Sequence, residues 1–103
     1  MFNFLKSLFG GSSDMTEIKQ LLESGSAVII DVRTPQEFAG GAPKGAKNFP
    51  LDRLEMNIEK LKAFQKPLVV CCASGVRSAR AKGLLKSKGI ENVYDAGSWY
   101  NLA

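Results

Sequence analysis

The sequence contains no histidine, and its only two cysteines, Cys71 and Cys72, are adjacent. Without histidine, neither a Cys–His catalytic pair nor a Cys/His zinc site can form. Two adjacent cysteines also do not make the disulfide framework of a small secreted domain. A reactive thiol in this chain would have to be activated by arginine, lysine, backbone dipoles or its own loop. We expect neither a metal nor a cofactor.

Acidic residues are absent from residues 61–90, which carry seven lysines and arginines. The rest of the chain holds seven cations and ten acids, so +7 in this segment and −3 elsewhere give the net charge of +4. The cations form either a solvated helix face or a field that attracts anions. The segment has little aromatic interleaving and no known nucleic-acid-binding motif, which argues against a nucleic-acid partner.

At 103 residues, the chain is long enough for one domain with its own core. Residues 1–9 are apolar but too short to span a bilayer, and no small-residue cleavage site follows them, which argues against a secretory signal. Contact of this segment with a membrane or partner is the alternative to a packed or mobile tail. Residues 10–13 are glycine and serine, typical of a flexible connection. We therefore expect a tail over residues 1–13, one domain over residues 14–103, and a cytoplasmic protein.

Hydrophobic periodicity and turn residues predict helices that alternate with strands. Asp14 and Thr34 each precede a glutamate by three residues, the pattern of a capping box at a helix start. Gly83 lies inside an expected helix, where a close approach of that helix to the sheet is one reason for a glycine. We expect helices over about 15–24, 35–39, 51–64 and 77–88, and strands over about 27–31, 46–49, 68–72 and 92–95.

This alternation predicts an α/β fold, a three-layer sandwich with a mostly parallel central sheet and helices on both faces. In such sheets, binding sites lie at the carboxyl ends of the strands. The segment Asp31–Arg33 and the residue Cys72 both follow or end expected strands. We therefore expect them to lie near one another.

Cys72 ends an apolar strand and begins a tight loop that runs into a helix. Backbone N–H groups of such a loop, with the positive end of the helix dipole, favour a thiolate and hold an anion beside it. We therefore expect Cys72 to be a nucleophile that acts on a small anionic or sulfur-bearing substrate. The expected loop residues are Ala73, Ser74, Gly75, Val76, Arg77 and Ser78.

Two further arginines, Arg33 and Arg80, are candidates for supporting the anion. The alternatives are an ion pair or loop brace for Arg33 with Asp31, and simple solvation for Arg80. Cys71 precedes Cys72 on the strand and therefore faces the opposite side of the sheet. We expect Cys71 in the core, and a resolving thiol is the other interpretation.

With the segment Asp31–Arg33 and the loop Cys72–Ser78, the chain resembles the single-domain rhodaneses, a family of sulfurtransferase modules. The resemblance runs from about Asp14 to the C-terminus. One segment differs: relatives usually read Gly-His-Ile-Pro-Gly-Ala where this chain reads Gly-Ala-Pro-Lys-Gly-Ala at positions 41–46. The resemblance is carried by Asp31-Val32-Arg33, Glu37-Phe38, Gly45-Ala46-Lys47-Asn48-Phe49-Pro50 and, above all, Cys72-Ala73-Ser74-Gly75-Val76-Arg77-Ser78.

The resemblance implies that Cys72 accepts a sulfane sulfur from thiosulfate or a similar donor and becomes a persulfide. The persulfide would pass its sulfur to cyanide or a thiol, including a thiol protein such as thioredoxin. The loop from Ala73 to Arg77 would cradle the outer sulfur, with Arg77 holding the loop or the donor anion. A second hypothesis is a sulfur-relay or binding module with little small-molecule turnover, docked through its basic face.

Loop length distinguishes a third hypothesis, a phosphatase or arsenate reductase. Relatives with those activities resemble this fold but have a loop longer by one residue, which admits a tetrahedral oxyanion. Here four residues separate Cys72 from Arg77. The shorter loop favours sulfur transfer over phosphate hydrolysis.

Overall fold

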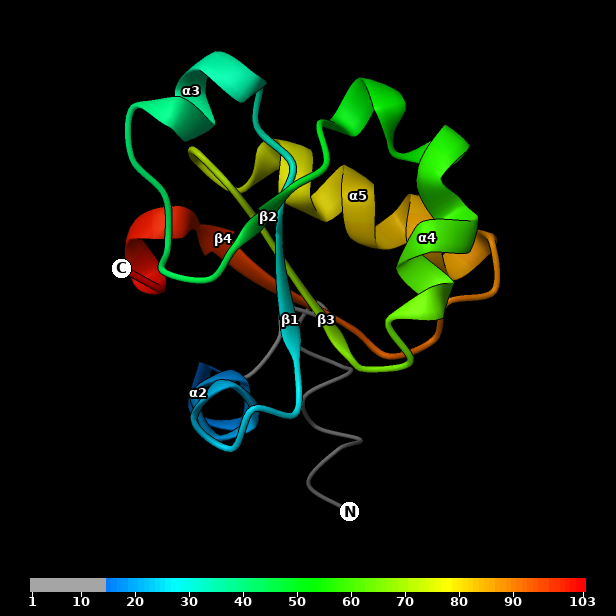
Figure 1. Ribbon diagram of the computed structural model, residues 1–103, viewed down its shortest axis with the longest axis horizontal. Coiled ribbons are helices and arrows are strands. Elements are labelled where there is room, and N and C mark those ends of the chain that lie inside the picture. Colours follow the sequence, from blue (N-terminus) through cyan, green and yellow to red (C-terminus); the bar gives the residue numbers. More distant parts are fainter. Residues whose placement is uncertain (1–14) are drawn as a thin grey trace.

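The computed structural model describes residues 15–103, which form a central parallel sheet with helices on both faces (Figure 1). The strand order is β2-β1-β3-β4, and every neighbouring pair is parallel. The predicted three-layer α/β sandwich is therefore confirmed. The strands are β1 (Val28–Asp31), β2 (Lys47–Asn48), β3 (Leu68–Cys72) and β4 (Val93–Ser98).

Helices cover the two faces of the sheet unequally (Figure 1). One face carries α2 (Met15–Glu23) and the short 3₁₀ turn η3 (Trp99–Asn101), and the other carries α4 (Ile58–Ala63) and α5 (Val76–Ser87). The short helix α3 (Pro35–Ala39) lies beyond the carboxyl ends of the strands. None of the helices within residues 15–103 is long and apolar enough to cross a lipid bilayer.

Strand β3 is the centre of the fold, and all five of its residues are buried. Successive side chains of a strand point to opposite faces. Accordingly, Cys72 belongs to the apolar cluster under α4 and α5, whereas Cys71 belongs to the cluster under α2 and η3. The expectation that the two cysteines face opposite sides of the sheet is confirmed.

The helix expected over 51–64 is instead three successive pieces: η1 (Leu51–Arg53), η2 (Glu55–Asn57) and α4. Asn57 accounts for the boundary between η2 and α4. Its side-chain amide donates to the carbonyl of Arg53 at 2.9 Å, the oxygen that its own backbone N–H would bind in an α-helix. The backbone N–H donates to Leu54 instead, at 3.0 Å, so the chain keeps 3₁₀ geometry until α4 begins.

Two further expectations need correction. The last strand does not end at 95 but continues to Ser98, with Ala96 as an extra residue between the register pairs of Asp95 and Gly97. Gly83 does not mark a close approach of α5 to the sheet, because it is exposed and a Cβ there would meet no atom within 4 Å. The capping box expected at Asp14 and the tail expected over residues 1–13 lie outside the described residues.

Candidate active site

Cys72 is the last residue of β3, at the carboxyl edge of the sheet, and is fully buried. Two backbone N–H groups donate to its sulfur: Gly75 N lies 3.0 Å from Sγ and Ser78 N lies 3.3 Å from it. Gly75 has a φ of +104°, a left-handed conformation that glycine adopts without strain and that lets the loop fold over the sulfur. The convergence of loop amides on this thiol, expected from the sequence, is present.

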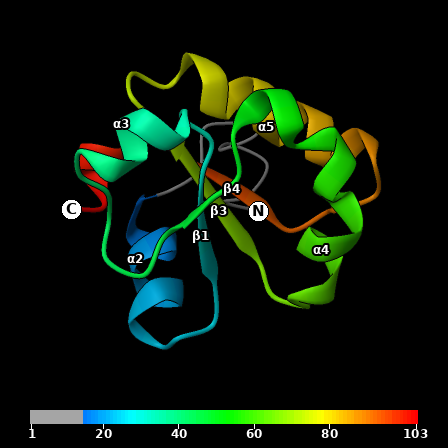
Figure 2. The same cartoon turned by 45° about the horizontal axis from the view of Figure 1, so that its top comes forward.

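The other loop residues surround Cys72 at different depths. Figure 2 shows the turn between β3 and α5 beside α3, at the carboxyl edge of the sheet. Ser78 is buried, and its hydroxyl donates to the carbonyl of Gly75 at 3.2 Å, which braces the loop across its own base. Ala73, Ser74 and Val76 are exposed on the outside of the turn.

The two cysteines differ in their tendency to ionise. Burial opposes ionisation of Cys72, but hydrogen bonds from Ser78 and from the loop amides outweigh it and lower the pKa of this thiol. Burial raises the pKa of Cys71 to about 12. At neutral pH, Cys71 is therefore a neutral thiol of the core, and Cys72 is the cysteine poised to become a thiolate.

Replacing Ser78 by alanine is expected to raise the pKa of Cys72, because the Ser78 hydroxyl lowers it. That hydroxyl donates to the Gly75 carbonyl in the structure, and it would have to turn from this carbonyl to the sulfur in order to stabilise the thiolate. The thiolate fraction of Cys72 at a given pH should therefore fall. The measurement is a pH titration of thiolate absorbance, taken as the difference from the Cys72→Ser variant. Ser87→Ala is a matched control, since its hydroxyl also bonds to a carbonyl in α5, that of Leu84, at 2.7 Å. An unchanged titration in Ser78→Ala would show that the hydroxyl does not tune the thiol.

Arg77, in the first turn of α5, binds the carboxylate of Glu37 in α3. Arg77 Nη1 lies 2.7 Å from Glu37 Oε1, and Nη2 lies 3.0 Å from Oε2. The same carboxylate completes the predicted capping box of α3, where Thr34 N donates to Oε1 at 3.0 Å. The Arg77 hydrogen bond, aided by Thr34, lowers the pKa of Glu37 to about 2. Glu37 was missing from the predicted site residues, because the capping pattern already accounted for it.

Arg33 is buried against Asp31 at the end of β1. Its Nε and Nη2 lie 2.6–3.0 Å from the Asp31 carboxylate oxygens, and Nη2 also donates to the carbonyl of Gly41 at 2.7 Å. The guanidinium lies 4.6 Å from the centre of the Trp99 ring. These contacts engage Nε and Nη2 and bury the side chain, so the structure favours the brace interpretation of Arg33 and gives no support to a role in holding the anion.

The family profile described as "Rhodanese-like domain" matches residues 14–101, which is most of the chain. The chain belongs to the rhodanese-like domain family.

Relatives and solved structures agree with this assignment. The chain is 39% identical over 69 residues to the uncharacterised protein YqhL of Bacillus subtilis, covering 67% of this chain but only 54% of that protein. It is 32% identical over 75 residues to the thiosulfate sulfurtransferase GlpE of Haemophilus influenzae, covering 73% of this chain and 70% of that protein. The human single-domain sulfurtransferase TSTD1 superposes with a TM-score of 0.75 at 31% identity, over 87% of this chain and 92% of that one.

A groove of about 340 Å³ opens beside the start of α5 in this rhodanese-like domain. Arg77 and Arg80 both line it, so the structure brings one predicted anion-supporting residue to the same groove as the loop arginine. Among residues 15–103, Arg80 forms no ion pair, which leaves its charge available to an anion. The remaining lining residues are Val32, Thr34, Pro50, Leu51 and Asp52.

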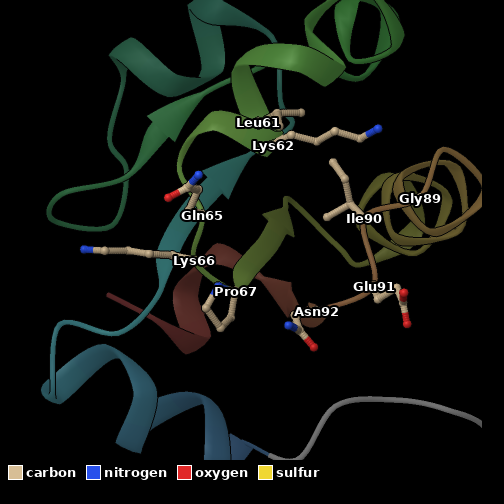
Figure 3. Close-up of a pocket in the computed structure, with 9 residues that line it drawn as sticks. All are labelled: Leu61, Lys62, Gln65, Lys66, Pro67, Gly89, Ile90, Glu91 and Asn92. Carbon is tan, nitrogen blue, oxygen red and sulfur yellow. The ribbon is translucent and has the colours of Figure 1, made fainter.

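A second cavity, of about 210 Å³, lies at the opposite edge of the rhodanese-like sheet (Figure 3). Pro67 and Asn92 line it, and these residues precede β3 and β4, whereas Cys72 ends β3. This cavity is therefore separate from the candidate active site. Its other lining residues are Leu61, Lys62, Gln65, Lys66, Gly89, Ile90 and Glu91.

Proposed function

We propose that this domain is a sulfurtransferase that moves a sulfane sulfur from thiosulfate or a related donor to a thiophilic acceptor through a persulfide on Cys72. The observation that carries the proposal is the pair of backbone amides, of Gly75 and Ser78, directed at Sγ. Such amides stabilise negative charge on sulfur without a general base. The names of relatives such as GlpE and TSTD1 support the same reaction class.

In the first step, the Cys72 thiolate attacks the outer sulfur of thiosulfate. The sulfur–sulfur bond of the donor breaks, its electron pair leaves with sulfite, and a new bond joins Sγ to the transferred sulfur. In the second step, cyanide or a thiolate attacks that outer sulfur, and the electron pair of the Sγ–S bond returns to Cys72. The two steps need no oxidant and no reductant. They also need no proton transfer from a histidine, which agrees with a sequence that contains no histidine.

Both steps require the loop to move. Cys72 is fully buried, so a donor cannot reach Sγ in the conformation described. Ala73, Ser74 and Val76 form the exposed outer side of the turn, with few packed neighbours to hold them in place. Transient displacement of these residues would expose the sulfur, and the loop amides would then close on the outer sulfur of the persulfide.

The proposal predicts that thiosulfate adds the mass of one sulfur atom to the intact protein, and that cyanide then removes it as thiocyanate. The measurements are intact mass before and after thiosulfate, and a colorimetric thiocyanate assay. Loading without turnover would favour the sulfur-relay alternative, in which a partner protein is the acceptor. Neither adduct nor thiocyanate with any sulfane donor would overturn the proposal, and hydrolysis of a phosphate ester inhibited by vanadate would favour a phosphatase.

A further inference from the structure

The arginine that ends the thiol loop is already bound to a carboxylate. The two-point contact between Arg77 and Glu37 matches the geometry in which guanidinium binds anions most strongly. Both side chains remain about one-third exposed, 32% for Arg77 and 36% for Glu37. A solute anion can therefore approach the same guanidinium, and it must compete with Glu37 for it.

The Glu37 carboxylate is also held in this position by Thr34, at the start of its own helix α3. Oε1 accepts hydrogen bonds from the backbone N–H of Thr34 at 3.0 Å and from the Thr34 hydroxyl at 3.2 Å, which ties the carboxylate to the first turn of α3. The chain on both sides of α3 is tied in turn by Arg33, through Asp31 before the helix and Gly41 after it. The carboxylate is thus a fixed negative charge beside Arg77.

We propose that Glu37 is a specificity-determining residue, which lowers the preference of the site for doubly charged sulfur donors by neutralising Arg77. The inference rests on the sulfurtransferase function proposed above. Coulomb energy scales with the charge of the donor, so a fixed carboxylate penalises a dianion more than a monoanion. Arg80 and Asp52 line the same groove with opposite charges, so the pairing of Arg77 with Glu37 leaves little net attraction there for either kind of donor.

Two donors of different charge test the proposal, thiosulfate and methanethiosulfonate. Each gives the same persulfide: the thiolate takes the terminal sulfur, and the electron pair leaves with sulfite or with methanesulfinate. In Glu37→Gln, the ratio of kcat/KM for thiosulfate to that for methanethiosulfonate should rise about fivefold, mainly through a lower KM for thiosulfate. Glu37→Asp keeps the charge beside Arg77, and its ratio should stay within about twofold of the wild type.

Glu55→Gln is the matched control, because Glu55 forms an exposed ion pair with Lys88 at 2.9 Å. It removes the same charge from outside the site and should leave the ratio unchanged. If Glu37→Gln slows both donors by the same factor, Glu37 only braces the loop, and the inference fails while the proposed function stands. If neither donor loads the wild-type protein, the proposed function itself fails, and the inference fails with it.

Discussion

Replacing Cys72 by serine should abolish both sulfur loading and thiocyanate formation, a loss of more than about 10³-fold. A serine hydroxyl does not ionise near neutral pH and cannot carry a sulfane sulfur. Replacing Cys71 by serine should leave both activities within about twofold of the wild type. The neighbouring thiol faces the α2 side of the sheet, and burial raises its pKa to about 12. The two variants have the same chemical change one residue apart, so each is the control for the other.

The readout for this pair is the intact mass after thiosulfate, followed by peptide mapping of the added sulfur. Cys71→Ser places a hydroxyl in an apolar cluster, which costs about 1–3 kcal/mol of stability. Both variants should therefore be compared below their unfolding transitions. Sulfur loading that persists in Cys72→Ser, or an adduct that maps to Cys71, would contradict the assignment of Cys72 as the carrier.

Much of the fold could be predicted because its signals are local. The run Leu68–Cys72 is apolar without a break, which is typical of a strand buried on both faces, and the structure buries all five residues. Thr34 and Glu37 form the capping box that their spacing predicts. The boundary between η2 and α4, inside the helix expected over 51–64, was not predictable in this way. There the Asn57 side-chain amide binds the carbonyl of Arg53, a contact that the spacing of apolar residues does not reveal.

In the candidate site, too, the features that are contiguous in sequence could be predicted, and the contacts between distant residues could not. The thiol, its loop and the helix start are contiguous in sequence, so their arrangement followed from strand, turn and helix signals. The partner of Arg77 is 40 residues away, and nothing in the local pattern says that α3 turns its Glu37 carboxylate toward α5. Arg33 shows the converse: the sequence left open both an ion pair or loop brace with Asp31 and support of the anion, and burial against Asp31 favours the brace.

Replacing Asp31 by asparagine should destabilise the fold by about 3–5 kcal/mol, because it leaves the Arg33 guanidinium buried without its counter-ion. Asp31 is fully buried and Arg33 is 4% exposed, so water cannot replace the lost interaction. A domain of this size has a free energy of unfolding of about 5–15 kcal/mol, so the loss is a large fraction of the total. Asp31 is also the register partner of Cys71, so the destabilised end of β1 lies beside the thiol loop.

Urea unfolding measures this effect, with Asp52→Asn as the control. Asp52 is exposed in η1, and its replacement should change the free energy of unfolding by no more than about 0.5 kcal/mol. The double variant Asp31→Leu, Arg33→Leu removes both charges and should be more stable than Asp31→Asn, because no unpaired charge remains in the core. If Asp31→Asn is as stable as Asp52→Asn, the buried pair does not hold the end of β1. If the double variant loses as much as Asp31→Asn, the loss comes from packing around Gly41 and Trp99, which Arg33 contacts, and not from its charge.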